Sequence, residues 1–423
     1  MALAKGLKQV ETAEGSQAVA SPKTSFFRRV LLALPLMFLA LVFTVVFNRL
    51  GLLTQLETGI LDTQMRLDEP EGESPVVIVD ITQQDFEQLF RGQTRPLLPS
   101  ALRQLVDAVA RGKPCVIGVD IDTHFTQFKD LAVSKEWPPV VWAREAADPA
   151  AAVGSRLSTL DVLGGQDAAL NGNSGLPLLI DDPGGMTRRY TRLFDTTGGP
   201  VPSFAWALYK ASRDARCPEL NYADLEEGTA QMLIRYSRGR EGIGRTHMPA
   251  LHVLTLARGD GWEKNALVAG KIVIIGSSYL GEDMHDTPFG RMTGVEVMAN
   301  VIESELRGGG IKPPSLPTIG LLLFFEGFLL IALFQALPPK QALLFSLPLV
   351  VVLSLACSLL TYRSFSRWAF FAPVMIGVIA ADLIDMLKDH YKQKIKDAYA
   401  AARGSVNDPR REAPPERGQD PEG

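Results

Sequence analysis

The sequence predicts an α/β domain with a largely parallel sheet, joined to four apolar helices, one before the domain and three after it. Two observations lead to this prediction. In the middle of the chain, short runs are almost wholly apolar, which is typical of strands buried on both faces of a parallel sheet. Towards the two ends lie apolar stretches long enough to cross a bilayer. A mean hydropathy of +0.09 beside 21% charged residues agrees with apolar blocks joined to a soluble region.

Length, charge and cysteine content exclude several classes of protein. The chain has 423 residues, which is enough for two or three domains, and only three cysteines, so it is not a small disulfide-stapled fold. The net charge of −4 provides no basic field for capturing nucleic acid. We therefore expect no nucleic-acid partner.

The first apolar stretch, 30–47, runs for 18 residues without a charge and is predicted to be a transmembrane helix. No small-residue cleavage site follows it, which favours an uncleaved anchor over a removable signal peptide. Basic residues precede it and favour a cytoplasmic position for segment 1–29. These residues are Lys5, Lys8, Lys23, Arg28 and Arg29.

Three more apolar stretches, 319–337, 341–361 and 368–387, are predicted to cross the membrane near the other end of the chain. Four spans return the chain to its starting side, so the tail 388–423, rich in proline and charge, should be cytoplasmic and mostly disordered. The intervening region 48–318 should then lie in a bacterial periplasm. The sequence thus predicts a multi-pass protein of the bacterial inner membrane with both termini in the cytoplasm.

Within the soluble region, three apolar runs predict buried strands: Pro75–Ile81, Cys115–Ile121 and Lys271–Ile275. Between the first two, Ser100–Arg111 carries apolar residues at helical spacing, which makes a strand–helix–strand unit. Weaker patterns indicate further strands at Val140–Trp142, Leu176–Ile180, Tyr190–Phe194 and Met232–Tyr236, helices at Ser203–Ala211 and Val295–Leu306, and a long loop or insertion over 144–175.

Acidic side chains stand at the predicted ends of two strands, Asp80 after the first and Asp120 with Asp122 after the second. Open α/β sheets bind ligands at this edge. The third strand runs into a polar segment that contains Ser277, Asp283 and His285. These residues are candidates for a pocket that binds a cation or a polar ligand. The alternative is that they only cap helices and turns, as Asp and Ser commonly do.

The Asp120-Ile121-Asp122 sequence also resembles the nucleophile loop of haloacid-dehalogenase-type phosphatases, in which the first Asp attacks phosphorus and the second is a general acid. The match fails where it matters, because Thr123 comes one position early and no suitable lysine or second acidic motif follows. The histidines match no zinc spacing, and no phosphate loop or nucleophile signature is present. We expect no enzyme activity, no metal and no cofactor.

Two further features concern single residues. Cys115 begins an apolar strand, so it is either a buried thiol or, in an oxidising periplasm, paired with Cys217. Glu326 lies near the middle of the predicted 319–337 span, where an ionised carboxylate costs about 2.5–3.5 kcal/mol. It should either hydrogen-bond within its own helix bundle or contact a transmembrane helix of a partner protein.

The segment 271–306, KIVIIGSSYLGEDMHDTPFGRMTGVEVMANVIESEL, resembles the closing motif of the type-two CHASE domain, the cyclase and histidine-kinase associated sensory extracellular family. Family members show a strand ending in Ile-Gly-Ser, then Asp, Thr-Pro and a Gly-Val-Glu helix start with Ala-Asn. The matching positions here are Ile275–Ser277, Asp283, Thr287-Pro288, Gly294–Glu296 and Ala299-Asn300. Other matches are Asp62 with Arg66, Val77–Asp80, Gly118–Asp120, Gly185 with Arg188-Arg189, and Pro202-Ser203.

The resemblance covers roughly 45–387 and implies a sensory domain between one span and three. Two departures qualify it. Met298 stands where the family usually has His, and the chain shows no cyclase or kinase domain after the last span. These features together predict a non-enzymatic sensory or accessory subunit that recognises a periplasmic ligand or envelope protein and relays it through a separate membrane partner. A structural scaffold for an envelope or membrane complex is the alternative.

Overall fold

The computed structural model describes residues 54–67, 339–365 and 390–399, the single positions 46, 317, 321, 324, 325 and 328, and most of 73–312. Within 73–312 the gaps are 93–96, 132–133, 148–155, 167–171, 183, 219, 221, 237–243 and 282. The chain divides into two units, one of which comprises Leu56–Pro314 with Leu359–Ala369. That unit holds the α/β domain.

A six-stranded sheet forms the centre of this domain, and each neighbouring pair of its strands is parallel. The prediction of a largely parallel sheet is therefore confirmed. In spatial order the strands are β10 (His247–Pro249), β1 (Val76–Ile81), β11 (Ile272–Ser277), β2 (Val116–Val119), β3 (Val140–Ala143) and β4 (Ser174–Gly175).

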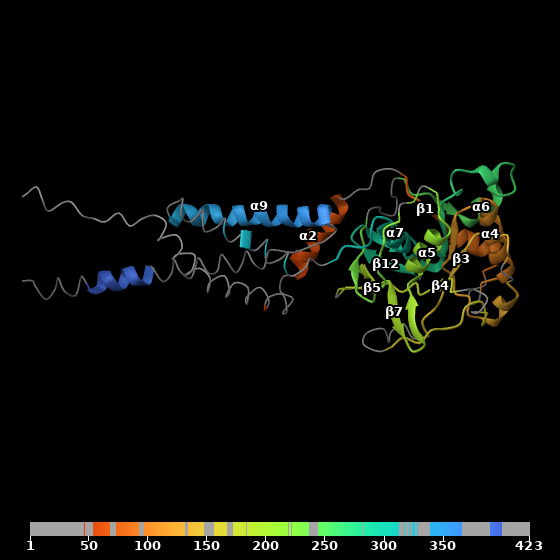
Figure 1. Ribbon diagram of the computed structural model, residues 1–423, viewed down its shortest axis with the longest axis horizontal. Helices are drawn as coiled ribbons and strands as arrows, with labels where there is room; N and C mark the ends of the chain where they lie inside the picture. Colours follow the sequence, from red (N-terminus) through yellow and green to blue (C-terminus); the bar gives the residue numbers. More distant parts are fainter. Residues whose placement is uncertain are drawn as a thin grey trace, which may run out of the picture. The chain divides into compact units, whose positions relative to one another are not determined.

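Helices cover both faces of the sheet, as the apolar runs require (Figure 1). Along β1, Val77 and Val79 belong to one apolar cluster, and Val76 and Ile78 belong to the other. Because strand side chains alternate between faces, each face of β1 is buried under a different layer. The first layer contains α3 (Gln83–Leu89), α4 (Pro99–Arg111) and α6 (Ala250–Leu256), and the second contains α2 (Thr54–Leu67), α5 (Phe204–Asp214) and α7 (Gly294–Leu306).

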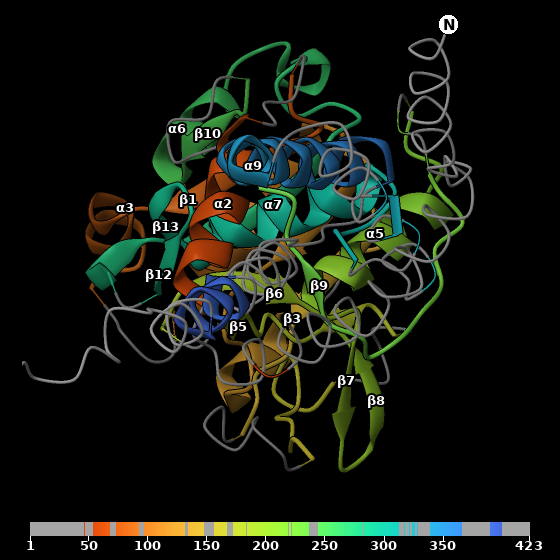
Figure 2. The same cartoon turned by 90° about the vertical axis from the view of Figure 1, so that its left-hand side faces the viewer.

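Three small antiparallel sheets adjoin this core. The first is a hairpin of β12 (Met284–Thr287) and β13 (Gly290–Thr293). The second pairs β6 (Thr187–Tyr190) with β5 (Ile180–Asp181) and β9 (Met232–Leu233). The third, β7 (Leu193–Thr196) with β8 (Gly199–Pro202), projects from the domain (Figure 2). Short 3-10 turns occur at Thr126–Asp130, Trp262–Lys264 and Tyr279–Gly281.

Two of the weaker strand predictions were wrong. Within the 176–180 run only Ile180 lies in a strand, as the first residue of β5, because Pro177 has no N–H to give to a ladder. The central sheet instead takes its edge strand from Ser174–Gly175. The 190–194 run is divided between β6 and β7. The chain turns at Thr191 and Arg192, where the Arg192 guanidinium points inward to Glu305.

Later in the chain, α9 (Pro339–Phe365) contains the predicted 341–361 span, and 390–399 is helical. Among the helices in the described part of the chain, none has both the length and the apolar composition needed to cross a membrane. The predicted spans 30–47, apart from Val46, and 368–387 lie outside the described residues, as does most of 319–337. The four-span arrangement stays a prediction.

Candidate functional site

A pocket of about 540 Å³ opens at the carboxyl ends of β2, β3 and β11. Four carboxylate side chains line it: Asp120, Asp122, Glu145 and Asp283. Apolar side chains and Gly294, the first residue of α7, complete the lining. Among the described lining residues, the only basic group is His124, so the pocket favours cations and hydrogen-bond donors.

Asp120 follows β2 directly, and its backbone N–H donates to Ile275 O of β11 at 2.8 Å. This bond fixes the side chain at the edge of the two central strands. The surrounding protein removes most of the solvation of the carboxylate, and that loss raises the pKa of Asp120 well above its usual value. The charges of Asp283 and Glu145 raise this pKa further.

Asp122 and His124 form a local pair beside Asp120. The Asp122 Oδ1 atom lies 2.6 Å from His124 Nδ1 and also accepts the backbone N–H of His124 at 3.2 Å. The imidazole ring stacks obliquely on Phe125, with ring centroids 3.9 Å apart. Asp122 is thus held in one orientation at the pocket wall, with its second oxygen Oδ2 outside these contacts.

Asp283 reaches the pocket from the segment between β11 and β12. Its backbone carbonyl accepts the N–H of Gly294, and a Cβ added to Gly294 would overlap Asp283 Oδ2. Glycine is therefore required at the first position of α7 for this carboxylate to lie where it does. The start of α7 is itself fixed by a capping box between Thr293 and Glu296.

Four of the six predicted site residues line the pocket together: Asp120, Asp122, Ser277 and Asp283. Asp80 is not among the lining residues. It is buried under the same sheet edge, where Ser278 Oγ donates to its Oδ2 at 2.6 Å and His247 Nε2 lies 3.5 Å from that oxygen. Asp80 thus contacts two neighbouring side chains and does not line the pocket.

His285 also lies outside the pocket lining. Its Nε2 is 3.0 Å from Asp283 Oδ1, and its Nδ1 is 3.2 Å from Thr187 Oγ1 on β6. It connects the pocket to a neighbouring strand instead of facing a ligand. Glu326 lies outside the described residues, so its predicted partner contact is neither supported nor opposed.

The sequence reasoning missed Glu145, which follows β3 in the same way as Asp122 follows β2. The signal was available, because Val140–Trp142 was already a predicted strand and Glu145 stands just beyond its end. Within the described residues, no group of three or more His, Cys, Asp or Glu side chains is arranged to hold a metal ion.

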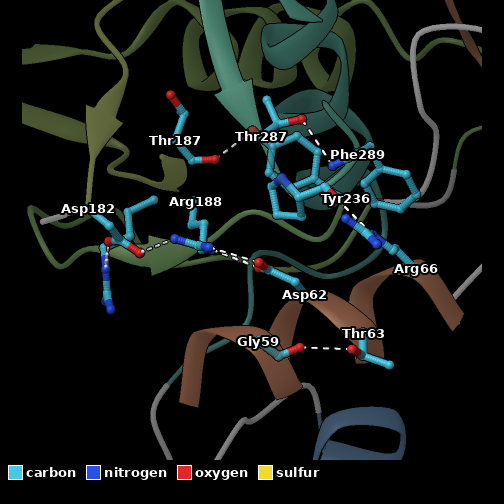
Figure 3. Close-up of polar contacts among 12 residues, drawn as sticks. Gly59, Asp62, Thr63, Arg66, Asp182, Thr187, Arg188, Tyr236, Thr287 and Phe289 are labelled. Atoms are coloured by element: carbon cyan, nitrogen blue, oxygen red, sulfur yellow. Dashed lines mark hydrogen bonds and ion pairs between the residues drawn. The ribbon is translucent and has the colours of Figure 1, made fainter. Parts of the chain in front are cut away.

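A second group of polar contacts clamps α2 to β6 (Figure 3). The Arg188 guanidinium donates to both carboxylate oxygens of Asp62, at 2.8 and 2.9 Å, and its Nη1 lies 3.5 Å from Asp182. Burial lowers the pKa of Arg188, but the hydrogen bonds and charges of Asp62 and Asp182 outweigh it and leave the pKa above its usual value. One turn later, Arg66 Nε donates to Pro288 O at 2.8 Å. We call these Asp62–Arg188 and Arg66–Pro288 contacts the α2 clamp.

Cys115 and Cys217 form a disulfide, with Cα atoms 5.5 Å apart. Of the two states that the sequence left open for Cys115, the structure has the paired one. The bond joins the start of β2 to the segment after α5, at the sheet end opposite the pocket. A disulfide is expected in an oxidising compartment.

This architecture occurs in a known family of domains. The CHASE2 domain matches residues 37–335 of the 423. The chain belongs to the CHASE2 family. The resemblance seen in the sequence is therefore confirmed, and the α/β domain with its pocket lies within the matched part. No curated protein and no solved structure matches the chain.

CHASE2 is a sensory extracellular domain, and this identity gives the pocket its context. The α2 clamp is formed by three side chains of the family pattern, Asp62, Arg66 and Arg188. Two further residues of that pattern, Asp120 and Asp283, line the pocket. Met298, where the family usually has His, is buried in α7 within the apolar layer. A buried thioether at this position packs against the core and offers no titratable group.

Proposed function

We propose that this CHASE2 protein is a non-enzymatic sensory or accessory subunit of the bacterial inner membrane. Its α/β domain would lie in the periplasm, bind a polar ligand in the pocket, and relay binding through a separate membrane partner. The observation that carries the proposal is the pocket itself, with four carboxylates at the sheet edge of a sensory domain. Ligands of open α/β sheets bind at this edge.

The chemistry of the pocket favours an organic cation. Asp120 is destabilised as an anion by desolvation and by two neighbouring carboxylates, and a bound ammonium group would relieve both effects. The described residues offer no metal-type cluster, whereas a chain of several amines could contact carboxylates spread over three strand ends. A linear polyamine such as spermidine is therefore a suitable probe.

A thermal-shift assay on the purified full-length chain tests ligand binding. Spermidine should raise the melting temperature by mass action, and the Asp120→Asn/Asp122→Asn double variant should lose most of that shift. The exposed Asp286 offers a matched control, since Asp286→Asn removes one carboxylate outside the pocket. A shift that persists in the double variant, or no shift with spermidine at all, would contradict a cation-binding pocket and favour the scaffold alternative.

The relay part of the proposal rests on α2, the helix that leads from the predicted span 30–47 into the domain. The α2 clamp gives this helix a fixed attachment to the domain, which is the connection a relay requires. Glu326 is the proposed contact with the partner. Crosslinking in native membranes should recover a partner with the wild type and with Glu326→Gln, but not with Glu326→Leu. Full recovery with Glu326→Leu would place the contact elsewhere.

The absence of catalysis is part of the proposal. Asp122 would be the general acid of a phosphatase, but its Oδ1 atom already contacts His124 Nδ1. Thr123 is buried, and its hydroxyl oxygen accepts a hydrogen bond from the Leu163 N–H at 3.3 Å. Purified protein with Mg²⁺ and p-nitrophenyl phosphate should show no turnover. Turnover that Asp120→Asn abolishes would show that the chain is an enzyme.

A further inference from the structure

His285 contacts two parts of the domain at once. On one side is the pocket carboxylate Asp283, 3.0 Å from Nε2, and on the other is the buried hydroxyl of Thr187, 3.2 Å from Nδ1. Thr187 immediately precedes Arg188, which holds Asp62 of α2 (Figure 3). A single imidazole thus separates the pocket from the α2 clamp.

The available protons show what the ring must carry for both contacts to be hydrogen bonds. Thr187 has one hydroxyl proton and donates it to Asp181 Oδ1 at 2.5 Å. The Thr187 oxygen can therefore only accept from His285, which requires a proton on Nδ1. An ionised Asp283 is likewise only an acceptor, which requires a proton on Nε2. Both contacts are hydrogen bonds only when the ring is doubly protonated and positively charged.

We propose that His285 is a proton-dependent positioning residue that joins the pocket to the α2 clamp. With both nitrogens protonated, the ring ties Asp283 to β6. Loss of one proton breaks one of the two bonds and leaves a lone pair facing an acceptor oxygen. Because the two contacts need protons on both ring nitrogens, the tie depends on the protonation of His285, and pH is the variable that tests it.

The neighbouring charged groups do not take part in the contacts that His285 makes with Asp283 and Thr187. Charged groups on the elements packed against β12 have other partners: Arg188 and Arg189 of β6 bind Asp62 and Asp182, and Glu303 and Glu305 of α7 bind Arg245 and Arg192. Glu296 of α7 binds Thr293 through its Oε2 atom. On the hairpin itself, Asp286 and Arg291 form an exposed pair 3.7 Å apart. The charges nearest His285 are therefore carboxylates, Asp283 directly and Asp181 through Thr187.

The hairpin also offers a direct route to α2. Pro288, at the turn between β12 and β13, accepts the Arg66 hydrogen bond of the α2 clamp. An isolated backbone bridge joins Met186 to Asp286, beside the His285–Thr187 contact. Releasing His285 would free the hairpin at one of its few attachments to β6, and the Arg66 contact would loosen with it. This relay to α2 rests on the proposed sensory function, whereas the pH dependence of the tie does not.

Amide hydrogen exchange of the purified full-length chain, without added ligand, tests the proposal. Rates for peptides 54–67 and 284–293 would be measured at pH 5.5 and pH 8.0 and corrected for intrinsic exchange. Hydrogen bonds to charged groups are strong enough that both segments should lose protection about tenfold at the higher pH. The α4 segment, 99–111, should change little and provides the internal reference.

Two variants and one control give the experiment its specificity. His285→Gln cannot titrate and should remove the pH difference, whereas His252→Gln, at an exposed position on α6, should keep it. Asp283→Asn can donate to a neutral ring and should stay protected at both pH values, which tests the proposal even if His285→Gln misfolds. A wild type with no pH difference, or a difference that persists in either site variant, would overturn the proposal. Because no ligand is present, this result is independent of whether spermidine binds.

Discussion

The α2 clamp should be worth several kcal/mol, because its central ion pair is largely removed from water. Arg188 is 7% exposed and Asp62 is 17% exposed, and the two form a bidentate contact at 2.8 and 2.9 Å. Breaking a buried pair by removing one partner costs about 3–5 kcal/mol. In Asp62→Ala, Arg188 keeps Asp182 at 3.5 Å, so we expect a smaller loss of about 2–3 kcal/mol.

Thermal unfolding monitored by tryptophan fluorescence measures this loss, since Trp142 and Trp206 are buried in the same domain. For a domain of this size the expected loss lowers the melting temperature by roughly 5–10 °C. The control is Asp286→Ala, which removes an acidic residue from a pair whose side chains are 64% and 68% exposed. Exposed pairs contribute about 0–1 kcal/mol, so the control should move the midpoint by little.

A double-mutant cycle separates the pair from other effects of the substitutions. Asp62→Ala and Arg188→Ala should each destabilise the domain, and the double variant should lose much less than the sum of the two. If Asp62→Ala costs no more than Asp286→Ala, or if the two losses add, α2 is not clamped to β6 as described.

Three further predictions concern the pocket and the disulfide. Burial raises the pKa of Asp120, so its ionisation opposes folding increasingly as the pH rises above the pKa that this carboxyl group has in the unfolded chain. Asp120→Asn should therefore stabilise the domain by about 1–3 kcal/mol at pH 8 and by less at pH 4, as measured by thermal unfolding at both pH values. Gly294→Ala should displace the Asp283 carboxylate and weaken spermidine binding in calorimetry, while the melting temperature changes little because the side chain can move. Replacing Cys115 and Cys217 with Ser should cost about 2–5 kcal/mol in thermal unfolding, since the bond closes a loop with a sequence separation of 102.

The sequence predicted those parts of the fold that depend on local pattern. Continuous apolar runs became β1, β2 and β11, and helical spacing became α4 and α7, in each case within a few residues. Strand order depends on contacts that no local pattern shows. β11 lies between β1 and β2 although it begins more than 150 residues after β2 ends. No local sequence pattern predicts that position in the sheet.

The candidate site was predictable to the extent that it follows from strand ends. Asp120, Asp122 and Ser277 stand at or just beyond the ends of recognisable strands, and the parallel sheet brings those ends to one edge. Asp283 reaches the same edge from the segment between β11 and β12. The α2 clamp involves residues 126 positions apart, so its geometry depends on the tertiary fold. Asp120 lines the pocket whereas Asp80 contacts Ser278, and this difference likewise depends on which neighbours cover each carboxylate.

Direct calorimetric titration of the full-length chain with spermidine at pH 7.5 tests the central claim, that the carboxylate pocket is a ligand site, more directly than any other measurement. We expect the wild type and Asp286→Asn to bind with the same affinity, and the Asp120→Asn/Asp122→Asn variant to bind at least tenfold more weakly. Equal affinity in all three proteins would place any binding outside the pocket. No heat of binding in the wild type at millimolar spermidine would contradict a cation-binding pocket.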